Sequence, residues 1–131
     1  MHTYHHQGLR FLIVSSDEHL VAILQTLVEA CSQNHECAYV SSAFACSTML
    51  HHGFDAVFID ARELYGYKGK GLAECVFLHN AALIVLARTD HDALLAYDIE
   101  ATDCLPIPLH QERFTVALKR IAQYRNSVLE Y

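Results

Sequence analysis

The sequence predicts an α/β domain built on a parallel β-sheet, and three observations support this prediction. Short runs of adjacent bulky residues such as Val57-Phe58-Ile59 need burial on both sides, which is typical of strands inside a parallel sheet. Segments with apolar residues at helical spacing alternate with these runs five times. Gly53 separates one helical segment from the next apolar run, as a helix stop does. Repeated strand–helix units place helices on both faces of the sheet through right-handed crossovers.

The expected elements alternate in a fixed order along the chain. Strands are expected at 10–14, 37–41, 54–60, 82–87 and 102–105. Residues 15–18 are typical of a helix start, and the helix they begin is expected to end near residue 32. Further helices are expected at 43–52, 72–79, 90–97, capped by Asp90, and 110–127. Residues 61–70, which include the possible contact residues Tyr65, Tyr67, Lys68 and Lys70, are expected to form a long exposed loop.

Composition limits the class of protein. The 131 residues suit one domain, and 53% hydrophobic against 18% charged residues argues against disorder. A net charge of -6 argues against direct nucleic-acid binding. No apolar run approaches the ~20 residues that span a bilayer, and residues 1–7 lack the apolar core of a signal peptide. We therefore expect a cytoplasmic protein that does not bind membranes.

The domain is expected to span residues 9–127. Residues 1–8 are predicted to be a flexible tail, and 128–131 a second tail or the start of a linker to an output domain. The five cysteines contain no CxxC pair and mostly lie in apolar patterns, which is typical of reduced core thiols. Neither the histidines nor the cysteines show a spacing typical of a metal site or a catalytic nucleophile. We expect no cofactor and no enzymatic activity.

Asp60 is the candidate site residue around which the chain is organised. It ends the central apolar run, and in open α/β sheets ligands bind at the carboxyl ends of the strands. A carboxylate buried there needs a partner, because desolvation alone would raise its pKa. Arg62, two residues later, and Arg88, after the fourth strand, are the candidate partners, unless both are merely solvated loop residues.

Over about residues 9–125 the chain resembles the receiver domain of two-component response regulators. The resemblance rests on 11–14 as the first strand and 54–60 as the phosphoacceptor strand. Segment 94–114 looks like the receivers that precede LytTR-type DNA-binding domains. The resemblance to receiver domains implies a flavodoxin-like (βα)5 three-layer sandwich with a five-stranded parallel sheet in the order 2-1-3-4-5. Asp60 falls on the phosphorylated aspartate, and Pro108 on the proline that usually follows a cis peptide bond.

The chain departs from the family pattern at the positions that handle phosphate. The acidic pair that holds Mg²⁺ is replaced by Ser15 and Ser16, and hydroxyls are poor substitutes because Mg²⁺ prefers charged oxygen ligands. Asp17 comes one residue after these two positions, so it could hold Mg²⁺ only if the register shifts. It is better interpreted as a helix cap. The switch hydroxyl, the switch aromatic and the conserved lysine of the family align with Ala87, Cys104 and Ile107. Phosphoryl transfer depends on the missing charges, so the resemblance implies a degenerate receiver, or pseudo-receiver.

The expected function is a phosphorylation-independent protein–protein interaction in signal transduction or transcriptional regulation. The resemblance implies a protein partner or a homodimer through the fourth helix, fifth strand and fifth helix, here residues 90–97, 103–105 and 113–124. Two alternatives stay open. One is a working phosphoacceptor in a phosphorelay, with Mg²⁺ held by Asp17 and Asp60. The other is a small-ligand sensor that uses the vacated pocket around Ser15, Ser16, Asp60 and Ala87.

Overall fold

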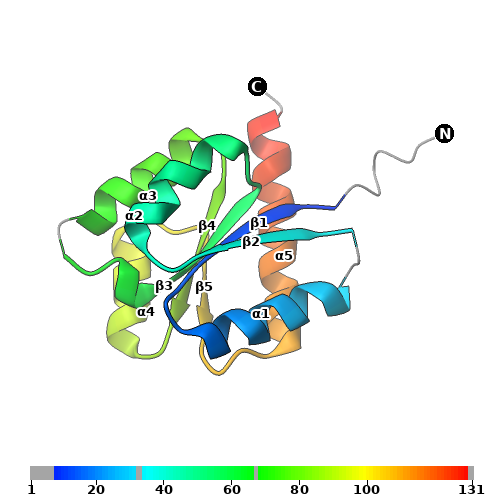
Figure 1. Ribbon diagram of the computed structural model, residues 1–131, viewed down its shortest axis with the longest axis horizontal. Coiled ribbons are helices and arrows are strands. Elements are labelled where there is room, and N and C mark those ends of the chain that lie inside the picture. Colours follow the sequence, from blue (N-terminus) through cyan, green and yellow to red (C-terminus); the bar gives the residue numbers. More distant parts are fainter. Residues whose placement is uncertain (1–7, 32–33, 67, 130–131) are drawn as a thin grey trace.

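The computed structural model describes residues 8–31, 34–66 and 68–129. Five parallel strands form one sheet in the order β2-β1-β3-β4-β5, which confirms the expected flavodoxin-like topology (Figure 1). The strands are β1 (Arg10–Val14), β2 (Glu36–Val40), β3 (Ala56–Asp60), β4 (Ala82–Ala87) and β5 (Asp103–Pro106). Residues 1–7 of the expected N-terminal tail and residues 130 and 131 lie outside the described residues.

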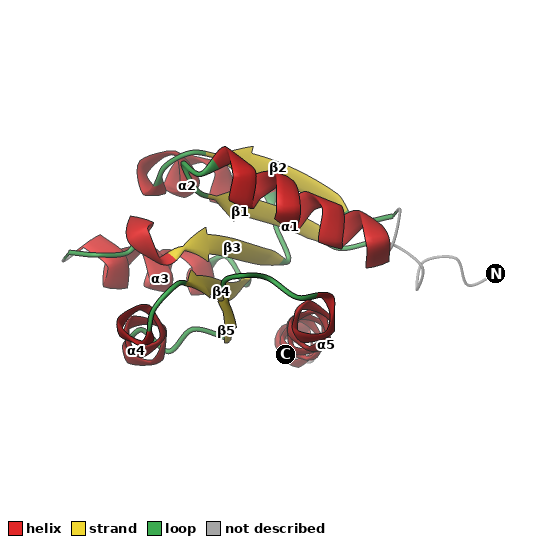
Figure 2. Cartoon of the chain, turned by 90° about the horizontal axis from the view of Figure 1, so that it is seen from below, coloured by secondary structure: helices red, strands yellow, loops and turns green. Residues whose placement is uncertain are grey.

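Five α-helices cover the two faces of the sheet. They are α1 (Glu18–Cys31), α2 (Ala43–Met49), α3 (Lys68–Leu78), α4 (Asp90–Asp98) and α5 (Gln111–Leu129). Figure 2 shows α1 and α5 on one side of the sheet and α2, α3 and α4 on the other. Two short 3-10 helices, η2 (Leu50–His52) and η3 (Ala61–Glu63), follow α2 and β3. The three-layer architecture therefore agrees with the prediction.

Local sequence signals fix several helix ends. The carboxylate of Asp17 accepts hydrogen bonds from the backbone N–H groups of His19 and Leu20, both at 3.1 Å, so Asp17 caps α1. Gly53 ends η2 with a φ of 83°, a conformation that favours glycine. The expected cap of α4 was wrong by one residue: the side chain of Thr89, not Asp90, accepts the hydrogen bond that caps this helix.

The strand that ends in Asp60 is buried throughout. All five residues of β3 are buried, as its uninterrupted apolar run predicts. On the α1–α5 side, the ring of Phe58 makes an edge contact with Phe11 and stacks on Phe114, with centroid distances of 5.3 Å and 5.8 Å. Aromatic contacts of this geometry add to the free energy of burial. They hold β3, β1 and α5 together and fix the position of Asp60.

The prediction of a loop over 61–70 was wrong at both ends of this range. Helix α3 begins at Lys68, four residues earlier than expected, and η3 occupies part of the remaining segment. A Cβ atom on Gly69 would lie 2.0 Å from the carbonyl oxygen of Leu64, so only glycine allows the start of α3 to approach that backbone. Tyr67 lies outside the described residues. The glycines of this segment shape a helix start rather than a mobile loop.

The cysteines differ in part from expectation. All five are free thiols, but Cys46 alone is fully buried, and Cys31 and Cys37 are exposed. These two lie where α1 ends and on the edge strand β2, where apolar patterns do not guarantee burial. Across the described residues, no group of three metal-binding side chains is placed to hold a metal ion. In the same residues, the longest helices are too polar or too short to cross a bilayer.

Candidate functional site: a closed acidic pocket

Asp60 lies at the carboxyl end of β3 with only 1% of its surface exposed. Its main partner is Arg88, the residue that follows β4. Arg88 Nη1 donates to Asp60 Oδ1 at 2.7 Å, and Arg88 Nη2 donates to Oδ2 at 3.2 Å. β3 and β4 are neighbours in the sheet, with Asp60 in register with Leu86, so the register brings the two side chains together. The result is a bidentate ion pair, the strongest common geometry for a carboxylate.

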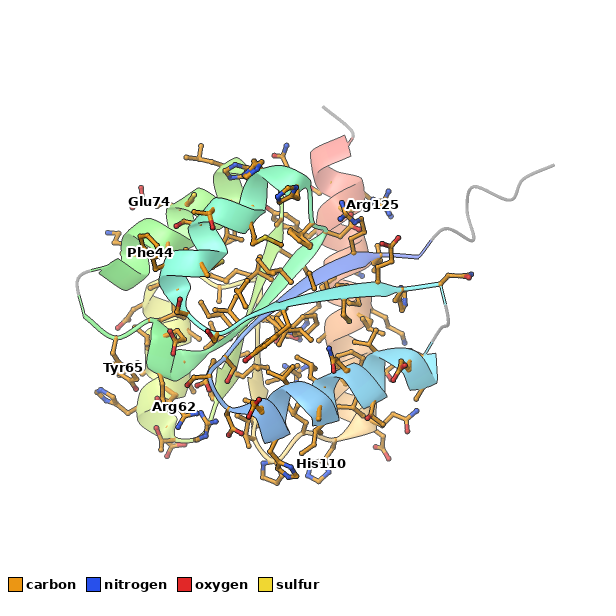
Figure 3. All side chains as sticks on the ribbon, viewed as in Figure 1. Phe44, Arg62, Tyr65, Glu74, His110 and Arg125 are labelled. Carbon is orange, nitrogen blue, oxygen red and sulfur yellow. The ribbon has the colours of Figure 1, made fainter. Side chains whose placement is uncertain are left out.

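Arg62 also binds the carboxylate of Asp60. Its Nε lies 3.3 Å from Asp60 Oδ1, its Nη2 lies 3.0 Å from Oδ2, and its backbone N–H donates to Oδ1 at 3.1 Å. Arg62 reaches back because η3 turns the chain directly after β3, and its side chain remains half exposed (Figure 3). Both oxygens of Asp60 therefore accept hydrogen bonds from both guanidinium groups.

Ser15 and Asp17 complete the pocket. The buried hydroxyl of Ser15 donates to Asp60 Oδ2 at 2.8 Å and accepts from the backbone N–H of Asp17 at 3.0 Å. The Oδ2 atom of Asp17 lies 3.2 Å from Arg88 Nη2 and 3.8 Å from Arg62 Nη2. Two carboxylates and two guanidinium groups thus form one neutral cluster. Ser16, the other predicted pocket position, is exposed and takes no part in this cluster.

The hydrogen bonds determine the charge state of the pocket. Burial by itself raises the pKa of Asp60, but the bonds from Arg88, Arg62 and Ser15 outweigh it and hold the pKa well below its usual range. The pKa of Asp17 is also lowered, chiefly by the backbone N–H of Leu20 and then by Arg88. Asp60 is therefore ionised throughout the physiological range, and its charge is neutralised by the protein itself.

This lowered pKa predicts an acid-sensitive contribution to stability. The pKa of an aspartate in an unfolded chain is about 3.9. A carboxylate whose pKa is lower than this in the folded protein stabilises the fold at pH values above about 3.9, and this contribution is lost as the pH falls below that value. Below pH ~4, we expect the free energy of unfolding of the wild type to fall more steeply with falling pH than that of Asp60→Asn. The two slopes should differ by up to about 1.4 kcal/mol per pH unit. Urea unfolding from pH 2 to pH 6 measures both slopes. Parallel slopes would show that Asp60 is not held in this state.

A second set of contacts connects the pocket to α4. The backbone N–H of Arg88 donates to Asp92 Oδ2 at 2.9 Å, and the hydroxyl of Tyr65 donates to Asp92 Oδ1. The Tyr65 ring stacks on His91 with a centroid distance of 5.6 Å and an interplanar angle of 3°. The hydrogen bond to Asp92 raises the pKa of Tyr65 to about 12. The first turn of α4 is therefore tied to the residue that pairs with Asp60 and to the segment after η3.

The three positions that correspond to the family's switch residues carry no phosphate-binding group. Ala87 is buried at the end of β4, and its carbonyl accepts a hydrogen bond of 2.8 Å from the backbone N–H of Ile107. The Ile107–Pro108 peptide bond is cis, as the resemblance implied. Cys104 packs against the core on the α2–α4 side. The cis peptide bond is present here, while the three side chains are apolar or weakly polar.

Sequence reasoning missed two clusters. The Tyr65–Asp92 contact joins residues 27 apart with no shared pattern. Asp103, buried at the start of β5, accepts hydrogen bonds from Arg113 at 2.9 and 2.5 Å and from Arg120 at 2.6 Å. A carboxylate at the start of an apolar strand, followed by two arginines seven residues apart on one helix, is a signal that could have revealed this second cluster. It fixes α5 against β5.

Comparisons with known proteins agree with the geometry. No family model and no curated protein sequence matches the chain. The signal receiver domain of an HD domain-containing protein from Pseudomonas fluorescens superposes with a TM-score of 0.78 at 18% identity, covering 95% of this chain and 93% of that one. The CheY-like response regulator receiver domain protein from Methanospirillum hungatei gives a TM-score of 0.73 at 13% identity, with 92% and 99% covered.

A third solved structure is similar to this chain over nearly the same length. The signal receiver domain of a modulated diguanylate cyclase from Desulfovibrio desulfuricans gives a TM-score of 0.75 at 13% identity, with 92% of this chain and 99% of that chain covered. At this level of identity the match establishes the fold, and the chemistry of the site must be argued from the residues present. This chain has the flavodoxin-like fold of CheY-like response regulator receiver domains.

Proposed function

We propose that this domain is a pseudo-receiver, an interaction module in signal transduction or transcriptional regulation that acts without phosphorylation of Asp60. One observation supports this most strongly: both carboxylate oxygens of Asp60 accept hydrogen bonds from Arg88 and Arg62. These guanidinium groups supply internally the positive charge that a receiver obtains from Mg²⁺ and lysine. A phosphodonor would have to displace them to reach the nucleophile.

The donor set around Asp60 does not suit Mg²⁺. This ion requires near-octahedral oxygen ligands, preferably carboxylates, and is repelled by the two guanidinium groups. Two other side-chain oxygens belong to the cluster: the hydroxyl of Ser15, which already donates to Asp60, and Oδ2 of Asp17, which faces Arg88. The same groups occupy the space that a small-ligand sensor would need, so the interaction module is the better supported function.

The surface that would carry the interaction is the one formed by α4, β5 and α5. The Asp103 cluster fixes α5 on β5, and the Asp92 contacts fix α4, so this surface is rigid without any modification of Asp60. A rigid surface loses little conformational entropy when a partner binds. We propose that a protein partner or a second copy of the chain binds there, in one permanent conformation.

Incubation with acetyl phosphate and Mg²⁺, followed by intact mass measurement, tests the proposed function. We expect no phosphoryl adduct on the wild type, the same result as for Asp60→Asn, because the nucleophile is blocked. A phosphorylation-competent receiver domain serves as the positive control. A wild-type adduct that disappears in Asp60→Asn would support the working phosphoacceptor instead.

A further inference from the structure

Helix α4 presents two large apolar side chains to solvent. Tyr97 is 81% exposed, and Leu94 is more than half exposed. The two residues are three apart and therefore neighbours on one face of the helix, whereas the buried residues of α4 are Asp92 and Ala96. Tyr97 also borders a surface hollow of about 510 Å³ with Asp98, Glu100 and Ala101. Adjacent exposed apolar groups beside a hollow are typical of a protein-binding surface.

The Asp and Glu residues on α4 and directly after it give this segment charges of one sign. Asp90 and Asp98 lie one turn before and one turn after Leu94 on the same face, and Glu100 follows the helix. None of the three forms an ion pair with another described residue. The sequence from residue 89 to residue 112 contains no lysine or arginine. We call Asp90, Leu94, Tyr97, Asp98 and Glu100 the α4 patch.

The chain itself offers few cations to complement the α4 patch in a second copy. All six arginines already form ion pairs with carboxylates of their own chain, namely Arg10, Arg62, Arg88, Arg113, Arg120 and Arg125. Among the described side chains, the lysines without an ion pair are Lys70 on α3 and Lys119 on α5. Charge complementarity therefore favours a different protein over a second copy.

We propose that the α4 patch is the docking site for a cationic, apolar segment of another protein, in which lysines or arginines flank leucine-like side chains. This inference rests on the proposed function and names its partner by chemistry. An apolar side chain of the partner would pack on Leu94 and Tyr97, and its cations would pair with Asp90 and with Asp98 and Glu100, which line the hollow. Burial of the apolar side chains supplies most of the affinity, whereas the exposed ion pairs contribute less and fix the orientation.

The test uses fluorescence anisotropy with a labelled amphipathic peptide of lysine and leucine, and a second peptide with glutamate in place of lysine. We expect the lysine peptide to bind and the glutamate peptide not to bind. Tyr97→Ala should weaken binding at least about tenfold, as loss of a central aromatic contact does. Asp98→Asn should weaken it about threefold and reduce its dependence on salt.

Matched controls lie on other helices of the same face of the sheet. Phe44 on α2 is 83% exposed, and Glu74 on α3 is also exposed (Figure 3). Figure 2 shows α3 lying between α2 and α4. Phe44→Ala and Glu74→Gln repeat the chemical changes of Tyr97→Ala and Asp98→Asn away from the α4 patch. Both controls should leave the affinity for the lysine peptide unchanged.

Three outcomes would overturn the proposal. One is no binding of the lysine peptide, and another is equal weakening by Tyr97→Ala and Phe44→Ala, which would show non-specific attraction to an acidic protein. The third is a dimer that dissociates on Tyr97→Ala in sedimentation, with peptide affinity unchanged, since a second copy would then occupy the face. None of these variants touches the Asp60 pocket, so failure here is separate from a phosphoryl adduct at Asp60, which would defeat the proposed function.

Discussion

Arg88→Met is expected to lower the free energy of unfolding by about 3 kcal/mol, because it leaves a buried carboxylate without its bidentate partner. Methionine keeps an unbranched apolar stem of similar length but removes the charge and both hydrogen bonds to Asp60. Arg62 and Ser15 remain and limit the loss. Urea unfolding at neutral pH measures the change.

Two comparisons define what Arg88 contributes. Arg125→Met removes a half-exposed ion pair with Asp55 and should cost no more than about 1 kcal/mol. The double substitution Asp60→Leu with Arg88→Met removes both buried charges, and should recover much of the loss seen for Arg88→Met alone. A loss below about 1 kcal/mol for Arg88→Met would show that the ion pair is not needed to keep Asp60 buried.

Phe58→Ala is expected to have an effect at least as large, about 3–5 kcal/mol, because it empties the centre of the core. Its ring is fully buried between Phe11 and Phe114, and these contacts join β1, β3 and α5. The loss combines the hydrophobic free energy of the ring with the cavity that it leaves. Thermal and urea unfolding both measure it.

Phe44→Ala is the matched control for Phe58→Ala, because it removes the same side chain from an exposed site on α2. We expect a change within about 0.5 kcal/mol. A loss of several kcal/mol at Phe44 would mean that its ring is covered, for example by a second copy of the chain. A small loss at Phe58 would contradict the core packing described for β3.

The fold could be predicted from the sequence because the strands are buried on both faces. In β3 and β4 every residue is apolar except Asp60, which leaves little doubt about where these strands lie. The start of α3 could not be predicted in this way. Gly69 and Gly71 are poor helix formers, and the reason for Gly69 is a close approach to Leu64 that only the tertiary structure reveals.

The site was only partly predictable. A buried carboxylate needs partners, so sequence alone could name Arg62 and Arg88 as candidates, and the structure places both guanidinium groups against Asp60. Sequence alone could not show that Asp17 both caps α1 and faces these arginines, because each role uses a different oxygen. The hydrogen bond from Tyr65 to Asp92 depends on how the segment after η3 packs against α4, and the spacing of residues in the sequence does not reveal this packing.

We propose that Arg62 and Arg88 take the place of Mg²⁺ and of the family's lysine at Asp60. A backbone amide NMR titration with Mg²⁺, followed by beryllofluoride as a mimic of an aspartyl phosphate, tests it most directly. We predict no saturable shifts around Asp60 at millimolar Mg²⁺, and none on α4 or β5 after beryllofluoride is added. Saturable shifts that centre on Asp60 and spread to α4 and β5 would contradict the claim and identify a working phosphoacceptor.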